Sequence, residues 1–284
     1  MTKAATIRAI YKCLLRDARD LQRTPQFRLR NALRLEQWGV GHFVETPSKT
    51  SSSSGDVSSN KDANEGVAEA QKTTKLADIR SLEEYLTLRE EGFAYGDQSQ
   101  NADLEAIIRE SFRNNMRIKD PKEISEKVDG AILALQELSE QMLLAKCSSV
   151  TTTRGVRIEA TSQYVETHSN PEQSIYRFTY RIMITNENEH EAVQILGRQY
   201  TFESEKGQRI ALPRNSPGIV GATPVLAPGE TFEYASGVDI DAPRGSVTGC
   251  LHTLHRTKQP EGNDELFDAY VSKFALLSPF ASQQ

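Results

Sequence analysis

Cysteine and histidine side chains late in the chain are the residues best suited to catalysis or metal binding. Cys250, His252 and His255 fall within six residues. A thiol beside an imidazole can act as nucleophile and base, and the same two groups bind zinc. Alternate side chains of a strand point to opposite faces, so Cys250 and His252 share one face and His255 lies on the other. The pattern therefore predicts neither a nucleophile–base pair nor a metal site.

Other reactive patterns do not change this expectation. The sequence contains no G-x-S-x-G, H-E-x-x-H or paired-carboxylate arrangement. Its three cysteines, Cys13, Cys147 and Cys250, are widely spaced without a C-x-x-C pair, which argues against a disulfide framework and indicates a reducing compartment. No apolar run reaches the roughly 18 residues that a membrane span requires. We therefore expect a protein that is not an enzyme, binds no metal and does not span a membrane.

Basic residues are concentrated at the start of the chain. The net charge is −5, yet residues 1–34 hold nine Lys and Arg against two Asp. On a helix at 100° per residue, five of the basic residues fall in one sector, opposite an apolar stripe; they are Arg8, Lys12, Arg16, Arg19 and Arg23. Like charges four residues apart repel, so this face indicates an acidic partner, with an ordinary solvated face as the alternative. It does not predict sequence-specific nucleic-acid binding.

The elements that position these residues divide the chain into two domains. Residues 1–45 and about 76–146 have helical periodicity, whereas residues 46–75 are Ser-rich and predicted to be a disordered insertion. Leu104, Ile107, Ile108 and Phe112 mark one helix by their spacing. Two helix starts are also marked. Asp120 is the predicted N-cap before Pro121 and Glu123, and Ser81 with Glu84 forms a capping box for a short helix that we assign to the inserted part of the chain. The helix after Pro121 has an apolar stripe that includes Ile132.

From Arg154 onward the period changes to two. Residues 176–186 alternate apolar and polar side chains, which predicts a half-buried strand. Turn signals such as "SEKGQ", "LAPGE" and "DAPRGS" separate further runs of this kind. The predicted fold is α+β multidomain: a helical domain over residues 1–146 and an antiparallel β-sandwich over residues 150–280, joined by a linker near residues 147–153.

Short motifs of the helical domain resemble the LYR-motif (Complex 1 LYR-like) family of small mitochondrial three-helix proteins. "IYK" at residues 10–12 and "LLRDAR" at 14–19 match its signature, with conservative changes at two of the first three letters. Arg109 followed by "FRNN" at 112–115 matches its second helix, and "DPKE" at 120–123 matches the start of its third. The resemblance covers most of residues 5–145 and implies a three-helix bundle; the family usually lacks the insertion.

The resemblance also implies a partner. Similar proteins bind mitochondrial acyl carrier protein, whose acidic helix meets the basic face and whose acyl chain on 4′-phosphopantetheine enters the bundle. No cofactor would be bound directly, because the partner supplies this group. Tyr11 and Phe112 would line the acyl cavity or, alternatively, serve only as core aromatics. The implied binding residues are Arg8, Tyr11, Lys12, Arg16, Arg19, Arg109, Phe112 and Arg113.

Longer motifs of the second domain resemble the ApaG domain. They are "RGVRIEATSQYV" at residues 154–165, the run from Ser216 to Cys250, and "FDAYVSKFALLSP" at 267–279. The resemblance implies a fibronectin type III-like sandwich. The glycine-rich loop of that family appears here as "SPGIVG" at 216–221, with its first glycine replaced.

This loop could bind an anion such as pyrophosphate, or it could be purely structural. The candidate anion-binding residues are Arg214, Ser216, Gly218 and Gly221. Dinucleotide loops of this type open a helix whose amide groups meet the phosphate, but no helical pattern follows here. We therefore expect a structural loop.

Together these features predict a mitochondrial adaptor that binds acylated acyl carrier protein. It would serve as an assembly factor or accessory subunit of a larger complex — a respiratory complex, the mitochondrial ribosome or the iron–sulfur machinery — with the sandwich as the interaction module. The basic opening helix resembles an import signal, so we expect an uncleaved protein of the matrix or the matrix side of the inner membrane. The alternative is a nucleotide- or pyrophosphate-binding sandwich anchored by the helices.

Overall fold

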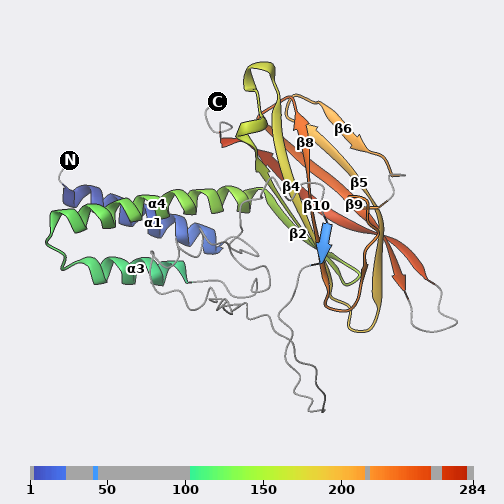
Figure 1. Ribbon diagram of the computed structural model, residues 1–284, viewed down its shortest axis with the longest axis horizontal. Coiled ribbons are helices and arrows are strands. Elements are labelled where there is room, and N and C mark those ends of the chain that lie inside the picture. Colours follow the sequence, from blue (N-terminus) through green and yellow to red (C-terminus); the bar gives the residue numbers. More distant parts are fainter. Residues whose placement is uncertain (1–2, 24–40, 44–102, 215–217, 257–263, 280–284) are drawn as a thin grey trace, which may run out of the picture.

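The computed structural model describes residues 3–23, 41–43, 103–214, 218–256 and 264–279. Three helices form an elongated body that projects from a β-sandwich (Figure 1). The insertion predicted at residues 46–75 and the short helix predicted from Ser81 lie outside the described residues. No helix in the described part has both the length and the apolar composition needed to cross a membrane.

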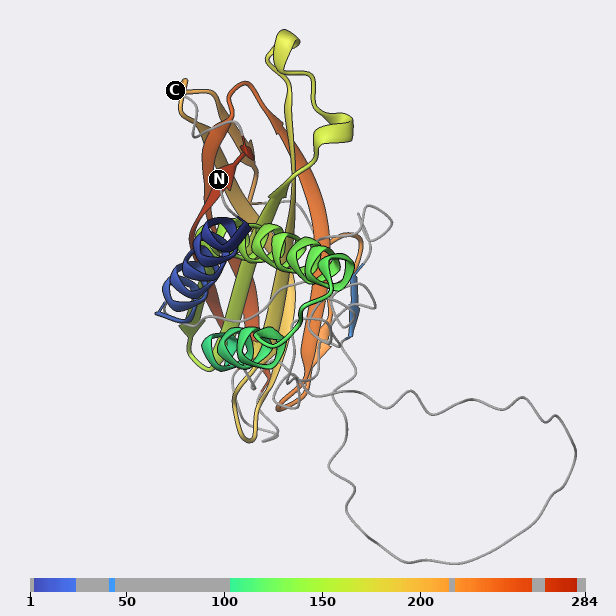
Figure 2. The ribbon, with the colours of Figure 1, turned by 90° about the vertical axis from the view of Figure 1, so that its left-hand side faces the viewer.

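The helical body consists of α1 (Lys3–Arg23), α3 (Leu104–Asn115) and α4 (Pro121–Lys146). Seen along their axes, the three helices lie at the corners of a triangle (Figure 2). Helix α1 packs against both of the others. Their apolar stripes form a core of their own: Leu14, Ala18, Leu21, Leu104, Ile107, Ile108, Ala131, Ala134 and Leu138. The prediction of three helices is confirmed.

The local signal for the start of α4 is also confirmed. Asp120 is the N-cap of α4, and its side chain accepts a hydrogen bond from the Lys122 N–H at 3.2 Å, with Pro121 in the first turn. One detail of the α4 stripe was wrong, because Ile132 is 41% exposed. The helix places small residues, Ala131 and Ala134, against α1 and turns Ile132 toward solvent.

The β part contains two antiparallel sheets. The first has the strand order β1-β8-β4-β3-β2 and the second β10-β9-β5-β6, with β7 pairing with β5. The bounds are as follows: β1 Gly41–Phe43, β2 Ser148–Thr153, β3 Val156–Tyr164, β4 Tyr176–Asn186, β5 Ala192–Ser204, β6 Arg209–Leu212, β7 Val225–Leu226, β8 Thr231–Ile240, β9 Arg244–Arg256 and β10 Glu265–Leu277, with short 3₁₀ turns at Glu166–His168 and Pro171–Gln173. The predicted antiparallel sandwich is confirmed.

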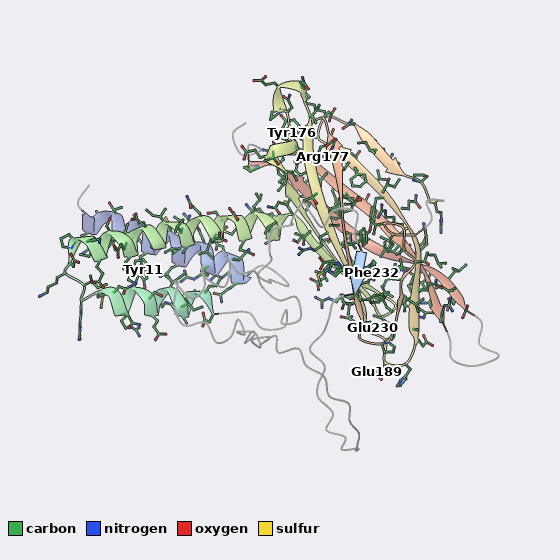
Figure 3. All side chains as sticks on the ribbon, in the orientation of Figure 1. Tyr11, Tyr176, Arg177, Glu189, Glu230 and Phe232 are labelled. Atoms are coloured by element: carbon green, nitrogen blue, oxygen red, sulfur yellow. The ribbon has the colours of Figure 1, made fainter. Side chains whose placement is uncertain are left out.

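Strand β1 corrects the helical prediction for residues 1–45. Gly41–Phe43 is not helical but pairs antiparallel with β8, adding an edge strand to the first sheet. Phe43 packs edge-on against Phe232, with ring centroids 5.4 Å apart, and Figure 3 labels Phe232 beside β1. Three residues are too few to show a period, so only the pairing with β8 reveals the strand.

Strand β4 is buried on both faces, so the prediction of a half-buried strand was wrong in this respect. Phe178 and Tyr180 enter the core between the sheets as expected, but Arg181 on the opposite face is also only 6% exposed. The Arg181 Nε lies 3.0 Å from Glu233 Oε1 on neighbouring β8. Because the two opposite charges neutralise each other, burying them together costs less free energy than burying either charge alone.

The predicted linker at residues 147–153 is instead strand β2. Helix α4 ends at Cys147, and β2 begins at the next residue. The Ser148 hydroxyl donates to the Leu144 carbonyl at 2.5 Å, and the Ser162 N–H donates to the Cys147 carbonyl at 3.1 Å. These hydrogen bonds join the last turn of the helix to the first sheet. At this junction the helical body therefore meets the sandwich with no loop between α4 and β2.

Candidate functional site

The basic face of α1 comprises the five residues predicted from the sequence. Arg8, Lys12, Arg16 and Arg23 are exposed, and Arg19 is half-buried. Two of the five form ion pairs with other described residues. Arg16 Nε lies 2.8 Å from Asp17 Oδ1, and Arg19 pairs with Glu105 of α3 at 3.2 Å. The face is therefore cationic at the surface and partly neutralised where α1 meets α3.

Glu105 lies between two of the predicted binding residues. It pairs with Arg19 of α1 and, at 2.6 Å, with Arg109 one turn along α3. The hydrogen bond from Arg19 lowers the pKa of Glu105, so its carboxylate stays charged to lower pH than usual. Arg19 and Arg109 thus have a structural partner. Within the part of the chain described, Lys12 and Arg113 form no ion pair and are exposed.

An apolar cavity of about 270 Å³ lies between the three helices at the end of the bundle away from the sandwich. It is formed by the first half of α1, the last half of α3 and the first half of α4. Its lining is mostly aliphatic and aromatic: Ile7, Ile10, Ser111, Phe112, Asn115, Met116, Ile118, Ile124, Lys127, Val128, Gly130 and Ala131. A side chain added at Gly130 would meet no atom within 4 Å of its Cβ, so the cavity is open at this position.

Tyr11 and Phe112 lie together beside this cavity. Their ring centroids are 4.8 Å apart with the planes tilted by 47°, and Figure 3 labels Tyr11 between α1 and α3. Phe112 lines the cavity, whereas Tyr11 packs behind it. Both residues therefore pack against the helical core, and Phe112 also forms part of the cavity wall.

A second cluster of reactive groups lies on the outer face of the second sheet. Cys250 and His252 of β9 lie beside Asp268 of β10, and one ligand atom from each lies within 4.8 Å of the other two. His252 Nδ1 is 2.8 Å from Asp268 Oδ1, and the Arg214 guanidinium donates to the same carboxylate at 3.2 Å. His255, on the opposite face of β9 as expected, lies 3.1 Å from Glu191.

Sequence reasoning missed Asp268. In the register of β9 with β10, His252 is directly opposite Asp268, although 16 residues separate them. Burial alternates along "FDAYV", with Ala269 and Val271 in the core, so Asp268 lies on the outer face. The sequence of this strand does not show which strand lies beside it. The cluster therefore depends on a tertiary pairing.

The thiol of Cys250 is not activated as a nucleophile in this arrangement. Its pKa is raised, chiefly by burial and further by the Asp268 carboxylate, while Arg214 acts in the opposite direction. A raised pKa leaves the thiol protonated near neutral pH, and a protonated thiol is a poor nucleophile.

The described part of the glycine-rich loop is held by hydrogen bonds between backbone groups. The Gly218 N–H donates to the Leu196 carbonyl at 2.8 Å, and Ile219 and Ala222 exchange hydrogen bonds of 2.7 and 2.9 Å. Gly218 is buried and Gly221 exposed, both with positive φ. Ser216 lies outside the described residues. Amide groups already bonded to carbonyls are not available to an anion, so the geometry favours a structural loop.

Comparisons with known proteins match the β part of the chain. The ApaG domain family matches residues 166–255, within the sandwich. Protein ApaG of Rhizobium meliloti is 35% identical over 45% of this chain and 91% of that protein. Protein ApaG of Rhizobium etli is 37% identical over 45% of this chain and 91% of its own length. A solved structure of an ApaA protein from Bordetella pertussis, 31% identical, covers 47% of this chain and 97% of that chain with a TM-score of 0.39.

These relatives are bacterial, and the matched length is less than half of this chain. The helical body therefore adds to what the relatives contain. Since the chain covers nine-tenths of relatives that are more than 30% identical, it belongs to the ApaG family through its C-terminal sandwich.

Proposed function

We propose that this protein is an adaptor that binds an acylated acyl carrier protein through its helices and a larger assembly through its ApaG domain. The observation that carries this proposal is the apolar cavity of about 270 Å³, which Ile7 and Ile10 of α1 line on the side of the helix opposite its basic face. One helix thus offers cationic side chains on its surface and apolar side chains to a cavity. A carrier protein presents the complementary pair, an acidic helix and a tethered acyl chain.

The LYR-type motifs support the same partner. "IYK" at residues 10–12 precedes "LLRDAR" at 14–19 on α1, and Phe112 of α3 lines the cavity as the resemblance implies. Exposed Arg8 and Lys12 would steer the acidic partner toward α1, while Arg19 and Arg109 would offer their remaining N–H groups. We extend the proposal to the mitochondrial matrix, since the LYR-type module and the basic amphipathic α1 both favour that compartment.

Acyl-chain length provides a quantitative consequence. Each methylene buried in an apolar cavity contributes about 0.8 kcal/mol, so two further carbons contribute about 1.6 kcal/mol, or roughly 15-fold in affinity. We expect the affinity of acyl carrier protein to rise in such steps with chain length until the cavity is full. Carrier protein without an acyl chain should bind only through the charged face and lose affinity in high salt.

Gly130 allows a direct test, because its added side chain would project into open space. Gly130→Phe should fill the cavity and remove the dependence on acyl-chain length. Gly130→Ala is the matched control, since it favours the helix by about 1 kcal/mol but adds only one carbon. Titration calorimetry with acylated and unacylated carrier protein measures both effects. Equal binding of the two carrier forms by the wild-type protein would refute the proposal.

The sandwich offers an interaction surface of its own. Leu266 and Tyr270 of β10 are 67% and 62% exposed, and both lie on the outer face of the second sheet. The two side chains lie on one face of the same strand with Asp268 between them, and large exposed apolar side chains on one face are typical of contact surfaces. Affinity purification followed by mass spectrometry should recover the host complex with the wild-type protein and lose it with Leu266→Ser/Tyr270→Ser. Retention of the carrier protein by that variant would show that the two surfaces act separately.

A further inference from the structure

We propose that Cys250, His252 and Asp268 form a zinc-binding site on the outer face of the second sheet. The site goes beyond the adaptor function and uses none of the helical residues. A thiolate, an imidazole nitrogen and a carboxylate oxygen are the three ligand types that zinc takes from proteins. No other group of three such side chains with this spacing occurs among the described residues.

The two strands hold the three side chains together. His252 and Asp268 are a directly opposed pair on β9 and β10, and Cys250 lies two residues before His252 on the same face. Tetrahedral zinc places neighbouring ligand atoms about 3.3–3.8 Å apart, given bonds of roughly 2.0–2.3 Å. The three ligand atoms already lie within 4.8 Å of one another, and His252 and Asp268 are 2.8 Å apart. Side-chain movements of about 1 Å, with no change of strand register, would complete the site.

Burial at the cluster is suitable for a metal that enters from solvent. Cys250 is 9% exposed, and the side chains of His252 and Asp268 are 14% and 30% exposed. The Nε2 atom of His252 is buried, with no hydrogen-bond partner in the described part of the chain. Zinc bound to Nδ1 would replace the present hydrogen bond between Nδ1 and Asp268, because both groups would then bind the same ion. A fourth position remains for water or for a side chain of a partner.

Arg214 borders the cluster and pairs with one of its members. Its guanidinium pairs with Asp268 at 3.2 Å, but its side chain is 64% exposed and can swing into solvent. Such an exposed ion pair contributes little to stability, so a metal ion can displace it. Arg214 would therefore compete with zinc for the Asp268 carboxylate, and removing it should strengthen zinc binding.

Titration of the full chain with zinc chloride tests the proposal. The protein should be free of an affinity tag, reduced and stripped of metal beforehand. We expect one zinc ion per chain and at least about 100-fold weaker binding for Cys250→Ser and His252→Gln, with a smaller loss for Asp268→Asn, whose amide oxygen can still bind the ion. Arg214→Ala should bind zinc more tightly than the wild-type protein. His190→Gln, at a histidine 88% exposed elsewhere, is the matched control and should bind normally.

Thiol alkylation provides a second measurement that needs no variant. Peptide mass spectrometry should show that zinc protects Cys250 from alkylation, while Cys13, on α1, reacts equally with and without zinc. The absence of zinc binding by the wild-type protein would overturn the proposal. So would unchanged stoichiometry and affinity in Cys250→Ser, or alkylation of Cys250 that zinc does not slow.

Discussion

Replacing Gly218 by alanine separates a structural role of the glycine-rich loop from an anion-binding role. Gly218 has φ +69°, and an added Cβ would lie 2.7 Å from the backbone oxygen of Ala222. That oxygen accepts a hydrogen bond from Ile219, so it is held in place. Two penalties therefore apply: about 1–2 kcal/mol for a left-handed residue with a side chain, and about 1–3 kcal/mol for overpacking.

Gly207 is the matched control for this substitution. Its φ is +88°, but an added Cβ would meet no atom within 4 Å. Gly207→Ala should therefore cost only the conformational penalty, about 1–2 kcal/mol, against about 2–5 kcal/mol for Gly218→Ala. Urea unfolding at 25 °C, followed by circular dichroism, measures both free energies of unfolding. An equal loss in the two variants would show that the loop yields to the added carbon, which would refute the close-packing argument.

Pyrophosphate titration of the wild-type protein completes the comparison. Because the amide groups of Gly218, Ile219 and Ala222 donate to carbonyl groups, we expect no saturable binding. Saturable binding that Gly218→Ala abolishes and Gly207→Ala leaves intact would instead support the anion-binding alternative.

Two further predictions concern alkaline pH and the charge of α1. Tyr200 and Tyr234 are fully buried, with hydroxyl oxygens 2.5 Å apart, and burial raises the pKa of both. The folded state therefore holds these protons more tightly than the unfolded state. Stability should be unaffected below the ordinary tyrosine pKa of about 10 and fall as the pH rises above it; melting temperatures across that range measure the loss, and a flat profile would contradict it. Reversing the exposed charges in Arg8→Glu/Lys12→Glu should slow association with acyl carrier protein and remove its salt dependence. Arg209→Glu/Lys273→Glu, the same change of charge on the sandwich, is the control; stopped-flow kinetics measures both, and equal slowing would show that only net charge matters.

The sequence alone determined most of the local structure. The helix start at Asp120 and Pro121 was predictable because capping depends on residues within one turn. The inward face of β4, including Phe178 and Tyr180, was predictable because a strand repeats every two residues. The long ApaG motifs identified the sandwich because they cover consecutive strands and turns.

Tertiary structure decided which elements meet. No periodicity marks Gly41–Phe43 as a strand, because three residues are too few to show one. The segment is a strand because it pairs with β8. From the sequence of β4 alone, Arg181 is expected to be solvated. Its ion pair with Glu233 of β8 explains why it is buried instead. An ion pair across strands depends on register, which the sequence of one strand does not contain.

The same distinction holds for the two candidate sites. The basic face of α1 was predictable since it lies within one helix, but its ion pair from Arg19 to Glu105 of α3 was not. Cys250 and His252 were recognised but set aside because His255 lies on the opposite face, and the third member of the cluster, Asp268, is supplied by the next strand. Residues on one element are related by a fixed repeat that the sequence displays. Residues on different elements become neighbours only through packing and strand register, and the tertiary structure alone supplies both.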